Sequence, residues 1–295
     1  MKSYNQKKEL KQLRNLESGK NRRSDLNYLI TKAEIRQFDE MGYLVLNDIL
    51  TESEMQTLDP WFERFISGKE MHRMGKDFCD MSQPYGTPVE EFQLVNAMLP
   101  STFCPEFAGN IFQRISQDIA NQLYTKGTAA MDYEQFLAKK PSKKNAEFSM
   151  HQDLGYWPKT KNTWTATFSL ALNDADVING CLYLIPGSNK ELELRKHKPK
   201  NYGSDDDEGA VNRDDSHTLV IESKPNDKLV YLPVKRGSIT IHDERIVHGS
   251  GGNNSPDWRK TYIIAYRDTQ TIAEERAIGF THSHNDNVDW NKIIT

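Results

Sequence analysis

The sequence has few cysteines and no long apolar run. Only Cys79, Cys104 and Cys181 occur among 295 residues, and no two of them form a Cys-x-x-Cys pair. This scarcity argues against a disulfide framework and favours a reducing, cytoplasmic compartment. No apolar stretch reaches the roughly 18 residues of a membrane-spanning helix, and the segment after Met1 lacks the apolar centre of a signal peptide. We therefore expect neither a membrane anchor nor export.

An excess of positive charge is also missing. The 38 Lys and Arg residues are outnumbered by 42 Asp and Glu residues, which leaves a net charge of −4 at pH 7. Binding to nucleic acid requires clustered basic side chains, and no such face is apparent in the sequence. We expect the partner to be a small-molecule substrate, and the protein to be a monomer or a homodimer.

The first part of the chain has a helical pattern. Residues 1–28 are charged, and we expect a flexible extension there rather than a basic arm that binds a partner. Capping boxes that begin at Thr31 and Thr51 predict two helices, with a short strand over residues 43–46 between them. Apolar residues at helical spacing predict a further helix over 108–125, which should cover a sheet.

From Ala129 onward the pattern changes to short strands separated by turns. We predict strands at 132–138, 147–151, 164–172, 181–186, 217–222, 229–232, 238–242 and 259–267. Such a series is typical of a sandwich or jelly roll. The prediction is a mainly β protein with flanking α-helices and one domain over residues 29–295. It consists of helical support over 29–128, a double-stranded β-helix (cupin-like jelly roll) over 129–270 and a tail over 271–295.

Two histidines and one carboxylate stand out within the predicted strands. In His151-Gln152-Asp153 the first and third residues point to the same side of a strand, and His248 follows 97 residues later at the end of another strand-like run. Two histidines and one carboxylate are the ligand set of non-haem Fe(II) oxygenases. A surface histidine beside a capping aspartate is the alternative interpretation of the first motif.

The surroundings of this motif carry a family resemblance. Residues 179–188 read N-G-C-L-Y-L-I-P-G-S, His248 opens an H-G-S sequence, and Arg259 lies 11 residues after it. In this order the motifs resemble the phytanoyl-CoA dioxygenase family of Fe(II)/2-oxoglutarate oxygenases, over roughly residues 30–270. Two positions depart from the family pattern: Asn189 replaces a histidine, and Ser238 replaces an aspartate.

The resemblance implies a cosubstrate and a reaction. It implies Fe(II) bound by His151, Asp153 and His248, with 2-oxoglutarate and O₂ as the other reactants. Oxidative decarboxylation would yield succinate and CO₂ and hydroxylate an unactivated C–H bond of a small molecule. The distal carboxylate of 2-oxoglutarate needs a cation, for which Arg259 offers a planar fork. Ser250 is placed to hydrogen-bond the same carboxylate.

Alternatives remain for several of these roles. Arg259 could instead pair with an acid of the core, in which case Arg267 would be the rival cation, and Ser250 could only shape a turn. A catalytically silent jelly-roll protein that keeps its metal is the second hypothesis for the whole chain. A zinc hydrolase is the third, but such an enzyme would need a general base beside the metal and would have no use for Arg259.

Other polar residues receive weaker predictions. His242 lies six residues before His248, and we expect it in the core or behind a metal ligand. Lys139 belongs to a K-P element common in the family and could contact a ligand or end a strand in water. We expect His282 and His284, in the tail, to lie at the surface.

Two irregular segments are longer than simple connections require. Residues 75–100 and 187–216 are polar and interrupted by proline, glycine or acidic runs. Long loops of this kind are usually functional or disordered. We predict that both form a lid over the substrate, although residues 201–216 could equally be a solvated loop.

Overall fold

A computed structural model describes most of the chain. The described residues are 22–142, 146–161, 163–199 and 218–286. The predictions for residues 1–21 and for the loop at 201–216 therefore lie outside the described residues.

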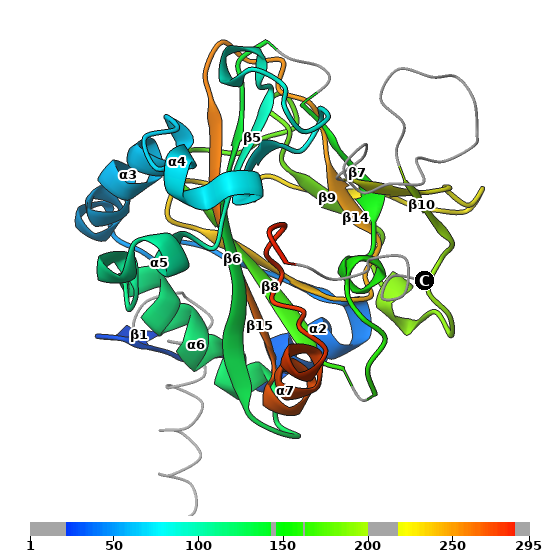
Figure 1. Ribbon diagram of the computed structural model, residues 1–295. Coiled ribbons are helices and arrows are strands. Elements are labelled where there is room, and N and C mark those ends of the chain that lie inside the picture. The colour runs from blue at the N-terminus through cyan, green and yellow to red at the C-terminus, as the bar shows by residue number, and fades with distance from the viewer. Residues whose placement is uncertain (1–21, 143–145, 162, 200–217, 287–295) are drawn as a thin grey trace, which may run out of the picture.

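Two antiparallel sheets face each other and form the jelly roll (Figure 1). The larger sheet has the order β3 (Tyr43–Leu46), β13 (Ile239–Asp243), β8 (Thr165–Ala171), β15 (Arg259–Asp268), β6 (Ala129–Lys139), β5 (Leu94–Met98) and β4 (Phe78–Asp80). The smaller sheet has the order β12 (Val230–Leu232), β9 (Leu182–Leu184), β14 (His248–Ser250) and β7 (Phe148–His151). This arrangement confirms the predicted fold class.

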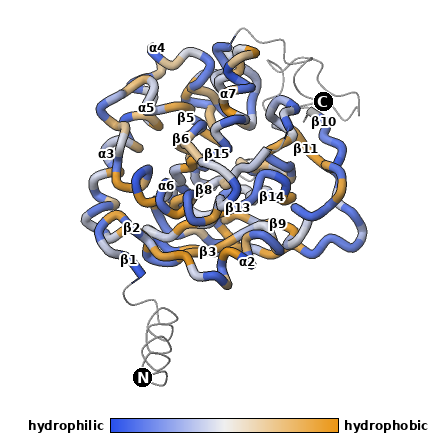
Figure 2. Tube along the Cα trace, turned by 90° about the horizontal axis from the view of Figure 1, so that it is seen from below, coloured by the Kyte–Doolittle hydropathy of each residue, from blue (hydrophilic) through white to orange (hydrophobic). Residues whose placement is uncertain are grey.

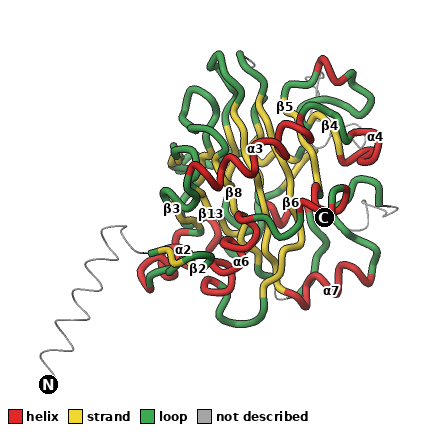
Figure 3. The backbone as a smooth tube through the Cα atoms, turned by 90° about the vertical axis from the view of Figure 1, so that its left-hand side faces the viewer, coloured by secondary structure: helices red, strands yellow, loops and turns green. Residues whose placement is uncertain are grey.

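Helices cover the outer face of the larger sheet, as Figure 3 shows for α3 and α6. The helices are α2 (Lys32–Met41), α3 (Glu52–Ile66), α4 (Met71–Met74), α5 (Pro100–Phe103), α6 (Ile111–Leu123) and α7 (Thr269–Ala277). The short 3₁₀ turns are η1 (Gly75–Asp77), η2 (Val89–Glu91), η3 (Pro105–Phe107), η4 (Asp153–Tyr156) and η5 (Ser188–Lys190). Both predicted capping boxes are present, at Thr31 and Thr51. None of the described helices combines the length and apolar character that crossing a membrane requires.

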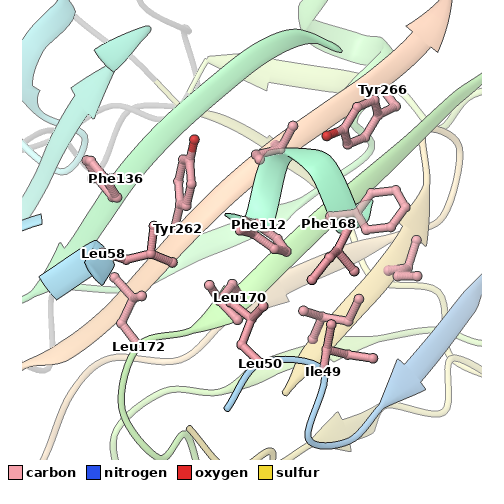
Figure 4. Close-up of a cluster of buried hydrophobic side chains, with 14 of the residues drawn as sticks. Ile49, Leu50, Leu58, Phe112, Phe136, Phe168, Leu170, Leu172, Tyr262 and Tyr266 are labelled. Carbon is pink, nitrogen blue, oxygen red and sulfur yellow. The ribbon is translucent and has the colours of Figure 1, made fainter. Parts of the chain in front are cut away.

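The alternation of β15 divides its side chains between the core and the barrel interior. Tyr262 and Tyr266 point outward, where Tyr262 packs with Phe112 of α6 and Phe136 of β6, and Tyr266 packs with Phe168 of β8 (Figure 4). The Tyr262 and Phe136 ring centroids are 4.6 Å apart. The residues that alternate with Tyr262 and Tyr266 along β15 line the cavity between the two sheets, namely Arg259, Thr261, Ile263 and Ala265. Figure 2 shows the matching contrast at the surface, where several outer loops are hydrophilic and β3 is hydrophobic.

Several elements differ from the sequence predictions. Residues 22–28, expected to be part of a flexible extension, form a hairpin of β1 (Arg23–Ser24) and β2 (Asn27–Tyr28). The backbone N–H of Tyr28 donates to Asp118 of α6 at 2.9 Å. Strand β5 lies fully buried inside a segment that we expected to be irregular. A second small hairpin joins β10 (His197–Pro199) to β11 (Leu219–Ile221).

Candidate active site

The two halves of the predicted metal site meet across a pair of strands. His151 ends β7 and is the direct register partner of His248, which opens β14. Asp153 lies just beyond the end of β7, at the start of η4, and the backbone of Gln152 between them is still extended, with φ −121° and ψ 131°, so the side chains of His151 and Asp153 point to the same side. Its Oδ1 is 3.3 Å from His151 Nε2 and 3.4 Å from His248 Nε2. The structure thus brings all three predicted ligands to one point.

The two histidine rings are held in the tautomer that a metal requires. The Nδ1 of His151 is 2.7 Å from the carbonyl of Ser149, and the Nδ1 of His248 is 3.0 Å from the carbonyl of Ile246. A carbonyl only accepts hydrogen bonds, so each Nδ1 carries the proton and each Nε2 presents a lone pair. Such an anchor on the far ring nitrogen is usual for a metal-binding histidine. The donor set therefore fits a divalent ion.

The second oxygen of Asp153 is occupied by protein. Thr167 Oγ1 donates to Asp153 Oδ2 at 2.8 Å, and His242 Nε2 is 3.1 Å from the same oxygen. Only Oδ1 is left to face His151 and His248. Burial acts to raise the pKa of Asp153, but the neighbouring His248, His151 and His242 lower it well below its ordinary value. His242 therefore lies behind a candidate ligand, as expected.

The loop that carries Asp153 is tied to two other segments by the buried Gln152. Its amide accepts from the backbone N–H of Arg195 at 2.8 Å and donates to the carbonyl of Arg245 at 2.5 Å. Its own backbone N–H donates to His197 Nε2 at 3.0 Å. His197 lies so close to Gly155 that a Cβ on that glycine would be 2.7 Å from the ring. The sequence analysis missed His197, whose position depends on the hairpin of β10 and β11.

Arg259 lies in the barrel interior without an acid. It is 6% exposed and makes no ion pair with any residue that the structure describes, and its Nε has no hydrogen-bond partner there. Burial lowers the pKa of Arg259 to about 10. The alternative in which Arg259 pairs with a core acid is therefore wrong for the described residues. A buried guanidinium in this state is complementary to a ligand carboxylate.

Lys139, the cross-strand partner of Arg259, is buried rather than exposed to water. Its Nζ donates to Ser250 Oγ at 2.8 Å, to the Ser250 carbonyl at 3.1 Å and to the carbonyl of Gly251. Burial and the charge of Arg259 lower the pKa of Lys139 well below its ordinary value. Because Ser250 Oγ accepts from Lys139, its own proton is free to point elsewhere, and Ser250 lines the cavity.

The backbone of the turn before β9 is in direct contact with the backbone of the loop that follows His248. Gly180 has φ +81°, and a Cβ built on it would lie 2.1 Å from the carbonyl oxygen of Gly251. Only glycine accommodates both the positive φ and this approach. The N-G and H-G-S-G-G motifs are thus two sides of one contact, which fixes the path of the chain between Ser250 and Arg259.

One cavity of about 140 Å³ includes His151, Asp153, His248, Arg259 and Ser250 in its lining. It lies between the two sheets. From the first predicted lid segment, Met81 and Met98 line the cavity. From the second, His197 lies behind the loop of Gln152, and residues 200–216 are outside the described residues. The lid therefore stays a prediction.

The tail forms a wall of this cavity, so the prediction that His282 and His284 lie at the surface is wrong. Both are buried and line the cavity together with Phe280. His282 Nε2 is 2.7 Å from Asp132 Oδ2, and the backbone N–H of His284 donates to Asp77 Oδ1 at 2.7 Å. In Figure 1 this segment, coloured red, rises from α7 toward the middle of the larger sheet.

A second group of metal-compatible side chains lies at the far end of β15. Asp132, Glu275 and His282 also place ligand atoms within 4.8 Å of one another. Here, however, Arg267 pairs with both carboxylates, and Arg276 pairs with Asp132. These guanidinium groups occupy the place of a metal ion. Arg267 is therefore already paired and is not available as the rival cation for a cosubstrate.

Comparison with known proteins gives one family and one fold. Residues 38–261 match the family model described as phytanoyl-CoA dioxygenase. The peroxisomal phytanoyl-CoA dioxygenase of Rattus norvegicus is 24% identical over 253 residues, which cover 81% of this chain and 69% of the relative. The ectoine dioxygenase of Halomonas elongata is 20% identical over 264 residues, with coverages of 82% and 72%.

Two solved structures show the same architecture. The crystal structure of EvdO2 from Micromonospora carbonacea var. aurantiaca complexed with 2-oxoglutarate is 20% identical, has a TM-score of 0.63, and is matched over 82% of this chain and 92% of its own. The crystal structure of EctD from S. alaskensis with bound Fe is 18% identical, with a TM-score of 0.60 and coverages of 82% and 78%.

Proposed function

Because this chain belongs to the phytanoyl-CoA dioxygenase family, whose members are 2-oxoglutarate-dependent non-haem iron dioxygenases, we propose that it hydroxylates a small molecule at an unactivated C–H bond. The overall reaction takes the substrate, 2-oxoglutarate and O₂ to the hydroxylated product, succinate and CO₂. One oxygen atom of O₂ enters the product and the other enters succinate. Residues 29–295 act as a single catalytic domain in this proposal, and three free, buried cysteines support a cytoplasmic location.

The metal ligands in this proposal are His151, Asp153 and His248. The observation that carries it is the convergence of two Nε2 lone pairs and one carboxylate oxygen, beside which the described residues place no lysine or arginine. When bound, Fe(II) supplies the activation of O₂ and of the 2-oxoacid. The protein's own part is to fix both imidazoles through their Nδ1–H groups and to leave Asp153 one free oxygen.

Arg259 and Ser250 bind the distal carboxylate of 2-oxoglutarate in this proposal. Arg259 has a fork of N–H donors that no described acid uses, and Ser250 has a hydroxyl proton that Lys139 leaves free. The charge of the carboxylate would also offset the cost of burying Arg259. Lys139 acts as a positioning residue because it holds Ser250 and the carbonyl of Gly251.

Apolar side chains around the candidate ligands exclude water from the reacting C–H bond. The ring of Phe148 lies 4.8 Å from that of His151, and the ring of Tyr156 meets His151 edge-on at 5.3 Å. Leu137 and Ile263 line the cavity from the opposite sheet. A substrate held among these groups would present a C–H bond rather than a polar group to the metal side.

Succinate formation tests the proposed function directly. Protein loaded anaerobically with Fe(II) and 2-oxoglutarate should show the charge-transfer absorption of the chelated 2-oxoacid and should release succinate slowly on exposure to air. His151→Ala, Asp153→Ala and His248→Ala should each lose both signals. Absorption without succinate would identify a catalytically silent binding protein, and full activity of His248→Ala would show that another histidine is the ligand.

A further inference from the structure

The lining of the cavity carries almost no charge outside the candidate metal and cosubstrate positions. Among the described residues that line it, the only carboxylate is Asp153 and the only guanidinium is Arg259; no lysine is present. Both belong to the proposed chemistry. At the end of the cavity away from Arg259, a prime substrate therefore meets no carboxylate, guanidinium or ammonium group of the described residues.

Charged residues do occur near that end, but each of them has protein partners away from the cavity. Arg267 is fully buried and pairs with Asp132 and Glu275. The ring of Trp157 covers Arg267, with the guanidinium carbon 4.3 Å from the ring centroid. Asp77 accepts hydrogen bonds from Ser283 Oγ at 2.6 Å and from the backbone N–H of His284 at 2.7 Å. None of these groups is left to pair with a charged substrate.

The walls at this end are aromatic and thioether groups. Tyr133, Trp157 and Phe280 contribute rings, and Met81 and Met98 contribute flexible apolar side chains. Flat rings favour offset or edge-to-face contacts with a second ring, and methionine adapts its shape to a bulky apolar ligand. Gln135 supplies a neutral polar group, whose oxygen accepts from the Tyr133 hydroxyl at 2.5 Å.

Phe280, His282 and His284 of the tail form the wall of the cavity at the end away from Arg259. His282 and His284 are 5% and 9% exposed, and the segment that carries them is fastened to the body of the protein at both ends. Arg276 Nη1 donates to the carbonyl of Phe280 at 2.8 Å, and Asn285 Nδ2 donates to the carbonyl of Met74 at 2.8 Å. A charged group of a ligand would find no counter-ion along this wall among the described residues.

From these observations we infer that the prime substrate is an uncharged, ring-containing molecule. This inference rests on the proposed function and adds the substrate class to it. The free-energy cost of moving a charged group from water to a site without a counter-ion is much larger than the gain from an apolar contact. The cavity therefore disfavours substrates that place a charged group inside it, such as the zwitterion ectoine.

Two fluorescent probes with one skeleton test the inference. N-phenyl-1-naphthylamine is uncharged, and 8-anilino-1-naphthalenesulfonate adds a single sulfonate to the same rings. The protein is loaded anaerobically with Fe(II) and saturating 2-oxoglutarate so that Arg259 is occupied. We expect the neutral probe to bind at least about tenfold more tightly. Equal affinities, or tighter binding of the sulfonate, would overturn the inference.

A matched pair of variants locates the bound probe. Met98, on β5, lines the cavity and is 3% exposed, whereas Met131, on β6, lies outside it and is 36% exposed. Met98→Arg should abolish binding of the neutral probe, and Met131→Arg should leave it unchanged. If Met98→Arg does not fold, as judged by circular dichroism, Gln135→Glu adds a charge at nearly constant volume. Unchanged binding of the neutral probe in the folded variant would overturn the inference.

Turnover separates this inference from the proposed function. Slow succinate release without any added substrate tests the proposed function alone. Phytanoyl-CoA and ectoine should then leave the rate of succinate release unchanged. If the protein releases succinate and either compound accelerates it, the substrate class is wrong while the proposed function stands. If no succinate forms at all, the proposed function fails, and the fluorescence preference still reports on the cavity.

Discussion

The two ends of β15 carry the same buried residue in opposite surroundings. Arg259 opens the strand without an ion pair among the described residues, and Arg267, eight residues later, pairs with two buried carboxylates. Burial lowers the pKa of Arg259 to about 10. Burial also opposes the charge of Arg267, but Glu275 and Asp132 raise its pKa above the ordinary value. One end of the strand is electrostatically complete, and the other lacks a partner in the part of the chain that the structure describes.

The same contrast separates the two histidine-carboxylate clusters. Asp132, Glu275 and His282 enclose guanidinium groups, whereas His151, Asp153 and His248 enclose none. Residue type and spacing alone would assign a metal to either cluster. The decisive difference is whether a protein cation already satisfies the carboxylates. An incomplete site is thus recognised by its missing charge.

Removing the paired arginine should have the largest effect. Arg267→Met would leave Glu275 buried without its counter-ion and Asp132 with Arg276 alone, at a cost of about 3–5 kcal/mol in the free energy of unfolding. Arg259→Met is the matched control and should cost little or even stabilise the fold, because no described acid loses a partner. Urea denaturation of both variants measures the difference. Equal losses in the two variants would abolish the distinction between the two ends.

Removing the unpaired arginine should affect the cosubstrate instead. Arg259→Ala should weaken 2-oxoglutarate binding by about 2–4 kcal/mol, or roughly 30- to 1000-fold. Arg259→Lys should restore only part of the affinity, because an ammonium group lacks the planar fork. Anaerobic calorimetry with Fe(II) present measures this, with Lys260→Ala, on the other face of β15, as the control. Unchanged affinity in Arg259→Ala would return the role to another cation.

Lowering the pH should reduce the stability that His282 contributes at the end of β15 that carries Arg267. Burial lowers the pKa of His282 to about 4, so the unfolded chain, with a pKa near 6.5, binds the proton first. Stability contributed by neutral His282 is therefore full above pH 6.5 and is lost as the pH falls toward 4, by up to roughly 3 kcal/mol. His282→Asn keeps a donor for Asp132 without a titrating ring. Its unfolding free energy should fall less over this interval, and an identical pH profile would contradict the assignment.

The smallest expected effect concerns the group behind Asp153. His242 holds Asp153 Oδ2 together with Thr167, and loss of such a partner typically lowers metal affinity about 10- to 100-fold. His242→Ala should therefore bind Mn(II), as followed by electron paramagnetic resonance, more weakly by that factor. His282→Asn, at the paired end, should bind it as the wild type does. If His242→Ala binds Mn(II) as tightly as the wild type does, His242 has only a packing role in the core.

The sequence predicted the incomplete end of β15 better than the complete end. His151, Asp153, His248 and Arg259 stand in local motifs, so their meeting could be inferred from strand periodicity and the family resemblance. The complete end depends on pairs far apart in the chain, such as His282 with Asp132, which are separated by 150 residues. No local pattern marks such a pair.

Elements with buried polar residues were also hard to predict. The buried residues of α7 are Thr271 and Glu275, so the helix has no apolar stripe. Strand β5 carries the fully buried Asn96 at its centre, which weakens the strand pattern. The burial of Lys139 follows from its bonds to Ser250 and Gly251, more than a hundred residues away. In each case a distant partner, rather than local propensity, decides the outcome.

The contact between Gly180 and Gly251 has a genetic consequence. A Cβ at position 180 would strike a carbonyl oxygen, not a side chain, so a second substitution that trims a neighbouring side chain cannot make room for it. Position 180 should therefore tolerate only glycine in every sequence background, and a suppressor screen starting from Gly180→Ala should return true revertants alone. Variation among natural homologues that keep this loop path should be equally absent at this position, whichever substrate each of them binds.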